Sequence, residues 1–397
     1  MAIDTPGSQS ALREANLRRV LRAVQAGGSL TQAEIVRSTG LSAATVSTIV
    51  RELQASGLVV VTPTARGRRA QSVSLSELNG LAIGIEMGQA HLRGAICDMG
   101  YRVLIEESID YGIAQSPEEG LRKVVWLVRT LMEQARVDRS RVRGIGVSVP
   151  GPLDPVTGGI GAVTLVPHWQ GMDITEELST QVSLPVKLIT EVNAAALGEL
   201  ACGASRRTAE VMYIRLSTSV EAALVLKGEI YPGSSGLAGQ FGHITVDESG
   251  RVCRCGNRGC LETVVGGPHL LDLLPGPPVH ERPTLRGLVQ AAVEGDLGFR
   301  RVIGDAGRAV GIAAAMLCNV LNPRQIVLGG ELALAGELLL DPIRQVLHRR
   351  TLPAAAELVE VRCGELGDRA VVVGALATVV RGTDVIDVID GVGALLA

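Results

Sequence analysis

Aromatic residues are scarce in this chain of 397 residues, where Phe, Trp and Tyr together make up only 2% of the sequence. Its hydrophobic cores must therefore be built from Ala, Val, Leu and Ile. The sequence has no apolar run that approaches the ~20 residues needed to cross a bilayer, and no signal peptide opens it. We therefore expect a protein of the cytoplasm, long enough for two or three domains.

Cysteine is not abundant either, with seven residues, but three of them lie within eight residues. Cys253, Cys255 and Cys260 follow His243 in the run GHITVDESGRVCRCGNRGCLE. Thiolates and an imidazole are the ligands of a closed tetrahedral zinc site, and the interspersed glycines let the backbone turn tightly. Because four protein ligands leave no position for an activated water, the pattern predicts a structural zinc ion. The alternative is three buried free thiols beside a core histidine.

A net charge of −3 hides an asymmetry along the chain. Residues 1–80 carry nine arginines and five acidic residues, which gives +4, whereas the remaining residues sum to −7. A small basic head on a larger acidic body indicates a polyanionic partner for the head alone.

Residues 1–78 have the pattern of a winged helix-turn-helix domain, an α+β fold. A first helix, with apolar residues at helical spacing, ends at Gly27-Gly28, and Thr31 is placed to cap a second short helix. Thr39-Gly40-Leu41 predicts a tight turn, after which Ser42 caps a third helix, SAATVSTIVRELQASG. The strands LVVVTPT and QSVSLS follow, and the arginine-rich tip between them is typical of a wing.

The outward side chains of the third helix are small or hydrogen-bonding, which suits the base edges of a major groove. Arginines at the tip of the wing can reach phosphates or a minor groove. We therefore predict contacts with double-stranded DNA from Ser42, Ala43, Thr45, Ser47, Thr48, Arg51, Arg66, Gly67, Arg68 and Arg69. The alternative is a protein-interaction module with a solvated charged tip. Such heads usually dimerise through other parts of the chain to bind two half-sites.

Residues 79–397 have the pattern of a duplicated α/β fold. Three strands, a helix and a further strand end in VRGIGVSVPGP, and the pattern restarts near 211 with VMYIRLSTSVEAALVLKGEIYPG. The repetition predicts two similar lobes in the actin-like architecture of sugar kinases, with a break near 195–210 and ligands at the carboxyl ends of the strands. The apolar helix around 306–320 suits the core better than a subunit interface.

Five motifs make the body similar to the family of repressors, open reading frames and kinases (the ROK family). They are GVSVPGPLDPVTG (146–158), EVNAAALGE (191–199), GQFGH (239–243), CRCGNRGCLE (253–262) and IVLGGEL (326–332). The resemblance extends from the winged head to about residue 380. A winged head is found on repressors of that family, and the layout is most similar to those that respond to xylose, glucose or N-acetylglucosamine.

The resemblance also shows departures at the positions that bind ATP in the family's kinases. Those kinases begin the first lobe with Asp-x-Gly-Gly-Thr, where this chain has Glu86-Met87-Gly88-Gln89-Ala90. Their second-lobe glycine loop is replaced by residues 217–223, in which Glu221 would repel phosphates. Gly329-Gly330 matches the adenosine side but can equally be a tight turn. We therefore predict a lost ATP site and no enzymatic activity. The alternative is an ATP-dependent sugar kinase with an added DNA-binding head.

The positions that bind sugar in the family's kinases are altered in this chain, but they match the family better than the positions that bind ATP. The general-base aspartate of the kinases corresponds to Glu191, and their Glu-x-Gly-His motif becomes Gln240-Phe241-Gly242-His243. Glu262 matches a carboxylate that contacts sugar in the family. The resemblance therefore implies a sugar pocket of Glu191, Gln240, His243 and Glu262, with Trp169 either at its entrance or simply packed.

Together these features predict a sugar-responsive transcriptional repressor, present as a homodimer or homotetramer, whose body binds a sugar without turning it over. A third hypothesis is a DNA-binding protein with a vestigial pocket, whose activity follows a protein partner.

Overall fold

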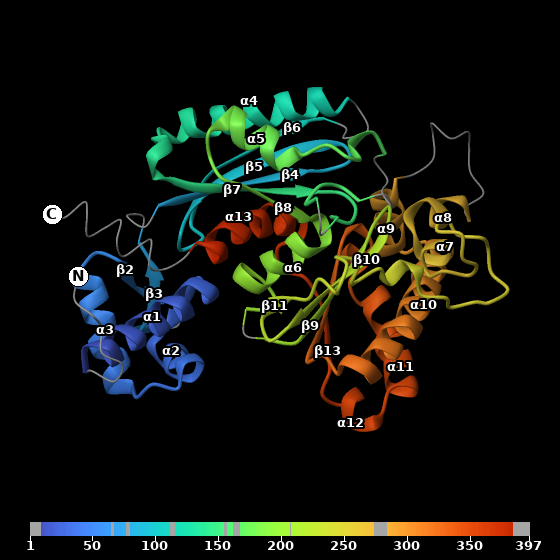
Figure 1. The fold of residues 1–397 in the computed structure, drawn as a ribbon. Coiled ribbons are helices and arrows are strands. Elements are labelled where there is room, and N and C mark those ends of the chain that lie inside the picture. The colour runs from blue at the N-terminus through green and yellow to red at the C-terminus, as the bar shows by residue number, and fades with distance from the viewer. Residues whose placement is uncertain are drawn as a thin grey trace. The chain divides into compact units, whose positions relative to one another are not determined.

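The computed structural model of the chain describes residues 9–64, 67–76, 80–111, 116–154, 157–161, 167–206, 208–273 and 284–383. The chain divides into two compact units (Figure 1). The first unit comprises residues 1–150, 166–189 and 372–397, and the second comprises residues 151–165 and 190–371. The predicted boundary between residues 78 and 79 falls within 77–79, outside the described residues.

The winged helix-turn-helix predicted for the head is present in the first unit. Three helices are accompanied by an antiparallel sheet in the order β1-β3-β2, and most of the buried side chains are aliphatic. The elements are α1 (Gln9–Gly27), β1 (Ser29–Thr31), α2 (Gln32–Thr39), α3 (Ala43–Ala55), β2 (Val59–Thr64) and β3 (Gly67–Leu75).

Local capping explains why the helices of the head begin and end where the sequence predicts. The Thr31 hydroxyl accepts from the Glu34 amide at 3.3 Å, while the Glu34 carboxylate accepts from the Thr31 amide at 2.8 Å, which completes a capping box. Gly40 ends α2 with a φ of 68°, a left-handed conformation that glycine adopts without strain. The Ser42 hydroxyl then accepts from the Thr45 amide and caps α3.

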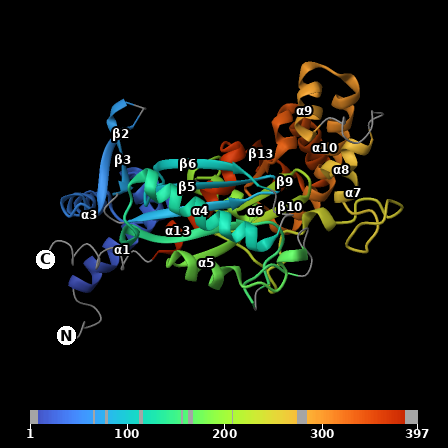
Figure 2. The ribbon, with the colours of Figure 1, turned by 90° about the horizontal axis from the view of Figure 1, so that it is seen from above.

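The rest of the first unit is built around a five-stranded sheet in the order β6-β5-β4-β7-β8. The central strand β4 is antiparallel to β5 and parallel to β7. Helices α4 and α5 lie on one face of this sheet and α13 on the other (Figure 1), and Figure 2 shows α4 across the strands that it contacts. The elements are β4 (Leu81–Met87), β5 (His91–Asp98), β6 (Val103–Asp110), α4 (Pro117–Ala135), β7 (Val142–Val149), α5 (Ile174–Val182), β8 (Val186–Thr190) and α13 (Ala370–Gly382).

The sheet of the second unit repeats that topology strand for strand, in the order β11-β10-β9-β12-β13. Its central strand β9 is antiparallel to β10 and parallel to β12, so the predicted duplication is confirmed. The strands are β9 (Val211–Leu216), β10 (Val220–Leu226), β11 (Glu229–Ile230), β12 (Gln325–Gly329) and β13 (Glu360–Cys363). The helices are α6 (Glu191–Cys202), α7 (Glu262–Val265), α8 (Gly267–Asp272), α9 (Leu285–Glu294), α10 (Leu297–Leu321), α11 (Glu337–Arg350) and α12 (Pro353–Ala356).

Helix α10 is, within the described residues, the single helix long and apolar enough to cross a membrane by length and composition. Half of its most apolar stretch is buried inside the protein, where it packs against α11 and α9. Ala306, Val310 and Ala313 belong to the hydrophobic core of the second unit. The apolar face of α10 is therefore core, as predicted.

Two glycines allow α13 to lie directly on the sheet of the first unit. A Cβ atom on Gly146 would lie 2.0 Å from the carbonyl oxygen of Ala375, and one on Gly84 would lie 2.8 Å from that of Val372. Because the obstructing atoms are backbone atoms of a helix, a side chain at either position would push α13 off the sheet.

We expect Gly146→Ala to lower the free energy of unfolding by about 3 kcal/mol, as overpacking of a core does. Gly304→Ala is the matched control, because its Cβ would meet only the flexible end of Arg308 inside α10. That control should be neutral or should stabilise the protein by up to about 1 kcal/mol. Chemical denaturation followed by circular dichroism measures both, and equal effects of the two changes would contradict the close approach of α13.

Candidate functional site

The four predicted metal ligands come together in the second unit. The ligand atoms of His243, Cys253, Cys255 and Cys260 all lie within 4.8 Å of one another. Cys253 Sγ is 3.6 Å from His243 Nδ1, and Cys255 Sγ is 3.7 Å from Cys260 Sγ. Zn–S bonds of about 2.3 Å at tetrahedral angles place sulfur atoms about 3.8 Å apart, so the donors fit a zinc ion.

A glycine-dependent loop brings these ligands together. The amide of Cys253 donates to the carbonyl of Asn257 at 2.7 Å, and that of Gly256 donates to the carbonyl of Cys253 at 2.9 Å, which forms a tight turn. Gly259 has a φ of 68°, and a Cβ there would lie 1.5 Å from the carbonyl oxygen of Asp247. Only glycine fits this position, which directly precedes the last ligand.

The group of three thiols and one imidazole is electrostatically suited to a dication. Burial, together with the neighbouring Cys255 and Cys253 thiols, raises the pKa of the Cys260 thiol to about 12. Thiolates held this close repel one another, and a zinc ion would stabilise them by neutralising their charge. With four protein ligands the ion would brace the loop.

Glu191 is the first residue of α6 and is only 4% exposed. The neighbouring Thr190 caps the helix by accepting from the Asn193 amide. The carboxylate of Glu191 forms an ion pair with Arg215 of β9, with Nη1 3.0 Å from Oε2. Arg215 also lies 3.8 Å from Glu221, its cross-strand partner on β10. The predicted sugar-binding carboxylate is therefore already held by a guanidinium.

Glu262 connects the ion cluster of Glu191, Arg215 and Glu221 to the metal loop, the segment 243–260 that carries the four predicted metal ligands. Its Oε2 accepts from the amide of Val220 at 3.3 Å, and its Oε1 pairs with Arg254 at 2.6 Å. Val220 directly precedes Glu221 at the start of β10. Glu191 is thus linked to Glu221 through Arg215 of β9, Glu262 contacts the residue before Glu221, and Glu262 follows Cys260 by two residues.

Gln240 is half-buried and precedes the 3-10 helix η4 (Phe241–His243), which ends in His243, a predicted metal ligand. Gly242 lies tightly against Val220, because a Cβ there would be 2.3 Å from the carbonyl oxygen of that residue. The segment that carries Gln240 and His243 therefore packs against the same start of β10 that Glu262 contacts.

The segments predicted to correspond to the phosphate loops of kinases make polar contacts within the protein. Ser217 donates its hydroxyl to Glu331 at 3.1 Å, and Glu331 also lies 3.6 Å from Arg286. Gly330 has a φ of 82°, and a Cβ on it would lie 2.4 Å from the carbonyl oxygen of Leu216, so this glycine serves a tight turn. In the first unit, buried Glu86 lies 3.4 Å from His91.

The predicted DNA-binding face of α3 is accessible. Ser42, Ala43, Thr48 and Arg51 are exposed, whereas Thr45 and Ser47 are half-buried. The opposite face packs into the head through four buried aliphatic residues, Val46, Ile49, Val50 and Leu53. Arg66 lies outside the described residues. Gly67, Arg68 and Arg69 are placed in β3, and their contact with DNA stays a prediction.

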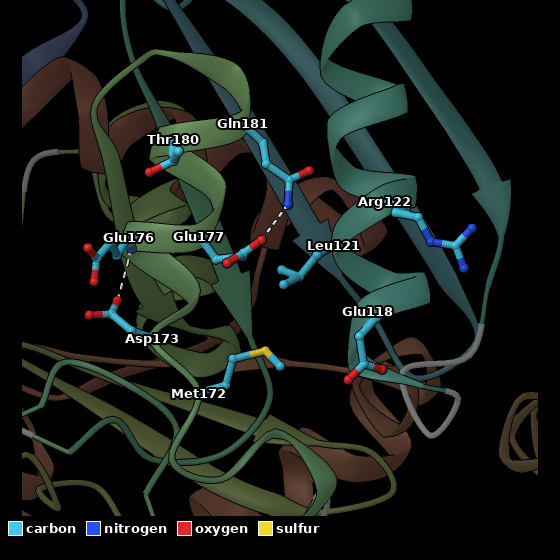
Figure 3. Close-up of a pocket in the computed structure, with 9 residues that line it drawn as sticks. All are labelled: Glu118, Leu121, Arg122, Met172, Asp173, Glu176, Glu177, Thr180 and Gln181. Carbon is cyan, nitrogen blue, oxygen red and sulfur yellow. Dashed lines mark hydrogen bonds between the residues drawn. The ribbon is translucent and has the colours of Figure 1, made fainter.

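A hollow of about 490 Å³ lies between α4 and α5 of the first unit (Figure 3). It is lined by Glu118, Leu121, Arg122, Met172, Asp173, Glu176, Glu177, Thr180 and Gln181. None of the predicted site residues is among them. Trp169 is fully buried in the same unit and lies against Gly120 of α4, where a Cβ would be 2.7 Å from the indole ring. Trp169 is therefore a packing residue.

The arginines that hold these carboxylates were not predicted from the sequence. Arg215 and Glu221 face each other across a hairpin, and their spacing in the strands flanking residues 217–219 could have indicated the pair. Arg254 lies between Cys253 and Cys255 and pairs with Glu262, and Arg286 pairs with Glu331 from a separate helix. No local pattern in the sequence indicates the contact between Arg286 and Glu331.

The ROK family profile matches residues 82–381, and the MarR family profile matches residues 18–70. A xylose repressor of Caldicellulosiruptor bescii is 29% identical over 391 residues, which cover 94% of this chain and 97% of that protein. A solved ROK family transcriptional regulator, described as a homologue of the Escherichia coli Mlc protein, is similar at 25% identity with a TM-score of 0.74, over 96% of this chain and 99% of its own.

A ROK hexokinase from Thermus thermophilus is also similar, at 29% identity with a TM-score of 0.63, over 78% of this chain and 99% of its own. The family profile covers well over half of the sequence, and it spans both repeated sheets and the cysteine-rich loop. The chain therefore belongs to the ROK family.

Proposed function

We propose that this chain is a sugar-responsive transcriptional repressor of the cytoplasm. Its winged head binds double-stranded operator DNA, and its kinase-like body binds a sugar or sugar derivative without phosphorylating it. The head matches the MarR profile and exposes one face of the capped helix α3, while 94% of the chain aligns with a relative named as a repressor. Two heads in a homodimer or homotetramer would bind two operator half-sites.

The ion cluster around Arg215 is the observation that carries the non-enzymatic part of this proposal. A general base needs its carboxylate oxygen directed at the sugar hydroxyl, but the Glu191 carboxylate is already engaged by Arg215, with Nη1 3.0 Å from Oε2. Glu221 belongs to the same cluster and would repel the phosphates of ATP. A carboxylate in this state can still accept hydrogen bonds from sugar hydroxyls.

The metal loop gives the proposed pocket a rigid wall. A structural zinc ion on His243, Cys253, Cys255 and Cys260 would fix Glu262, which already contacts the start of β10. Glu191, Gln240, His243 and Glu262 would then present fixed acceptors and donors to sugar hydroxyls, which is how sugar sites achieve selectivity.

A thermal-shift screen of the zinc-loaded protein against D-xylose, D-glucose, N-acetylglucosamine and their phosphates tests the proposal. We expect one sugar to raise the melting temperature and ATP with magnesium to leave it unchanged. Glu191→Ala should weaken that sugar at least about tenfold by removing a charged hydrogen-bond acceptor. Glu357→Ala, an exposed glutamate of the same unit, is the control and should bind the sugar normally.

ATP consumption that requires the same sugar and disappears in Glu191→Ala would favour the kinase alternative. No thermal shift with any sugar of the panel would favour the vestigial pocket and control by a protein partner.

A further inference from the structure

The side chain of Gln25 joins the DNA-binding head to the last helix of the body. Gln25 lies on α1 and is only 6% exposed, and its Nε2 donates to the carbonyl of Val380 and, at 2.7 Å, to that of Thr383. The last carbonyls of a helix have no partner within the helix, so Gln25 satisfies the carboxyl end of α13. Lys187 of β8 donates to Gly382 at 3.3 Å at the same helix end.

The segment that leads into α13 is held by one buried carboxylate. Glu199 of α6 is 1% exposed and accepts from the amides of Glu365 at 3.1 Å and Leu366 at 2.9 Å. It also accepts from the amide of Ala204 at 2.7 Å. Loss of this carboxylate would remove the acceptor of three part-buried amides, two of them in the loop before α13, so Glu199 ties that loop to α6.

The same helix α6 begins at Glu191, the proposed sugar-binding carboxylate. Eight residues of α-helix span about 12 Å, so a displacement at Glu191 is transmitted to Glu199 by one rigid element. Helix α13 then continues without a break from residues 370–371 of the second unit into the first unit. In the first unit the glycines that face it leave no space between helix and sheet.

We propose that α6, Glu199 and α13 connect the sugar pocket to the DNA-binding head, with Gln25 as the latch at the end of this connection. The inference rests on the proposed function. Sugar contact at Glu191 shifts α6, Glu199 moves the loop at 364–366 with it, and α13 changes the position of its last carbonyls. Hydrogen bonds weaken steeply with distance and angle, so a helix shift of about 1–2 Å releases Gln25 and frees the head.

Hydrogen–deuterium exchange of the full-length protein tests the connection without a ligand or an operator. Glu191→Ala perturbs the start of α6 in place of the sugar. We expect this change to speed exchange about tenfold both in residues 364–369 and in residues 20–27 of α1. When Gln25→Met is added, residues 364–369 should still respond to Glu191→Ala, whereas α1 should exchange fast already and respond no further.

Lys187→Met is the matched control, because it removes a donor from the same end of α13 that comes from the sheet instead of the head. It should leave the response of α1 to Glu191→Ala intact. The proposal is overturned if α1 responds equally with and without Gln25, or if Glu191→Ala changes neither segment. Should Gln25→Met fail to fold, Gln25→Asn, which keeps the amide but shortens its reach, gives the same comparison.

The sugar panel separates this inference from the proposed function. If hydrogen exchange shows the connection but no sugar gives a thermal shift, the sugar effector is rejected and the latch is retained as a hypothesis. A thermal shift with no propagation to α1 would keep the sugar effector and remove the latch.

Discussion

Serine in place of Cys260 is expected to abolish zinc binding and to destabilise the second unit. Cys260 is fully buried, and its Sγ is 3.7 Å from that of Cys255. The serine hydroxyl is a poorer zinc ligand than a thiolate, so the other three ligands would lack a fourth. A ligand present at a thousandfold above its Kd stabilises a fold by about 4 kcal/mol, and this contribution would be lost. Elemental analysis of the purified variant and its melting temperature measure the two effects.

The same change should weaken the proposed sugar site. Glu262 lies two residues after Cys260 and contacts the Val220 amide, so an unbraced loop no longer fixes that carboxylate. Cys202→Ser is the matched control, since Cys202 lies outside the metal cluster. A chelator should lower the melting temperature of the wild type and of the control but not that of Cys260→Ser. Full zinc content with unchanged melting in Cys260→Ser would favour the alternative of free thiols.

The metal loop was predictable because its determinants are local. His243 and Cys260 are separated by only 17 residues, and the glycines between them require specific backbone conformations whatever surrounds them. The helix caps of the head are equally local, because Thr31 pairs with Glu34 and Ser42 with Thr45. Such contacts follow from residue type and spacing alone.

The ion pairs and the latch depend on contacts between distant parts of the chain. Gln25 and Val380 are 355 residues apart, and Glu199 and Leu366 are 167 residues apart. Their hydrogen bonds form only where the complete fold brings those segments together, and no periodicity of the sequence records which side chain meets which backbone group. The motifs around Glu191 predicted a sugar contact, but the ion pair at that site depends on Arg215, whose place opposite Glu221 follows only from the sheet register.

The repeated sheets were predictable for a different reason. Each lobe reuses three antiparallel strands and a crossover, so the hydrophobic pattern appears twice and the second copy supports the first. The predicted break near 195–210 stays a prediction, whereas the two compact units of the structure meet along the chain between Ile189 and Thr190, where β8 gives way to α6. Their division places the proposed sugar-binding carboxylate on the first helix of the second unit.

Charge reversal on the recognition helix should have the largest effect on DNA binding. Arg51 is exposed on α3, and we expect Arg51→Glu to weaken binding about 100-fold near physiological salt, since a base or phosphate contact is replaced by repulsion. The slope of log K against log salt should also become shallower by about one unit, which corresponds to the loss of one phosphate contact. Fluorescence anisotropy with a duplex selected by the wild type from a random pool measures both quantities.

Folding should not change in this variant, because substitutions of exposed side chains usually alter stability by less than about 0.5 kcal/mol. Arg349→Glu is the matched control, an exposed arginine of α11 with the same change in net charge. It should leave DNA affinity close to that of the wild type. Equal losses in both variants would mean that net charge alone governs binding. If neither variant changes affinity or salt slope, α3 is no recognition helix, and the head is better explained as a protein-interaction module.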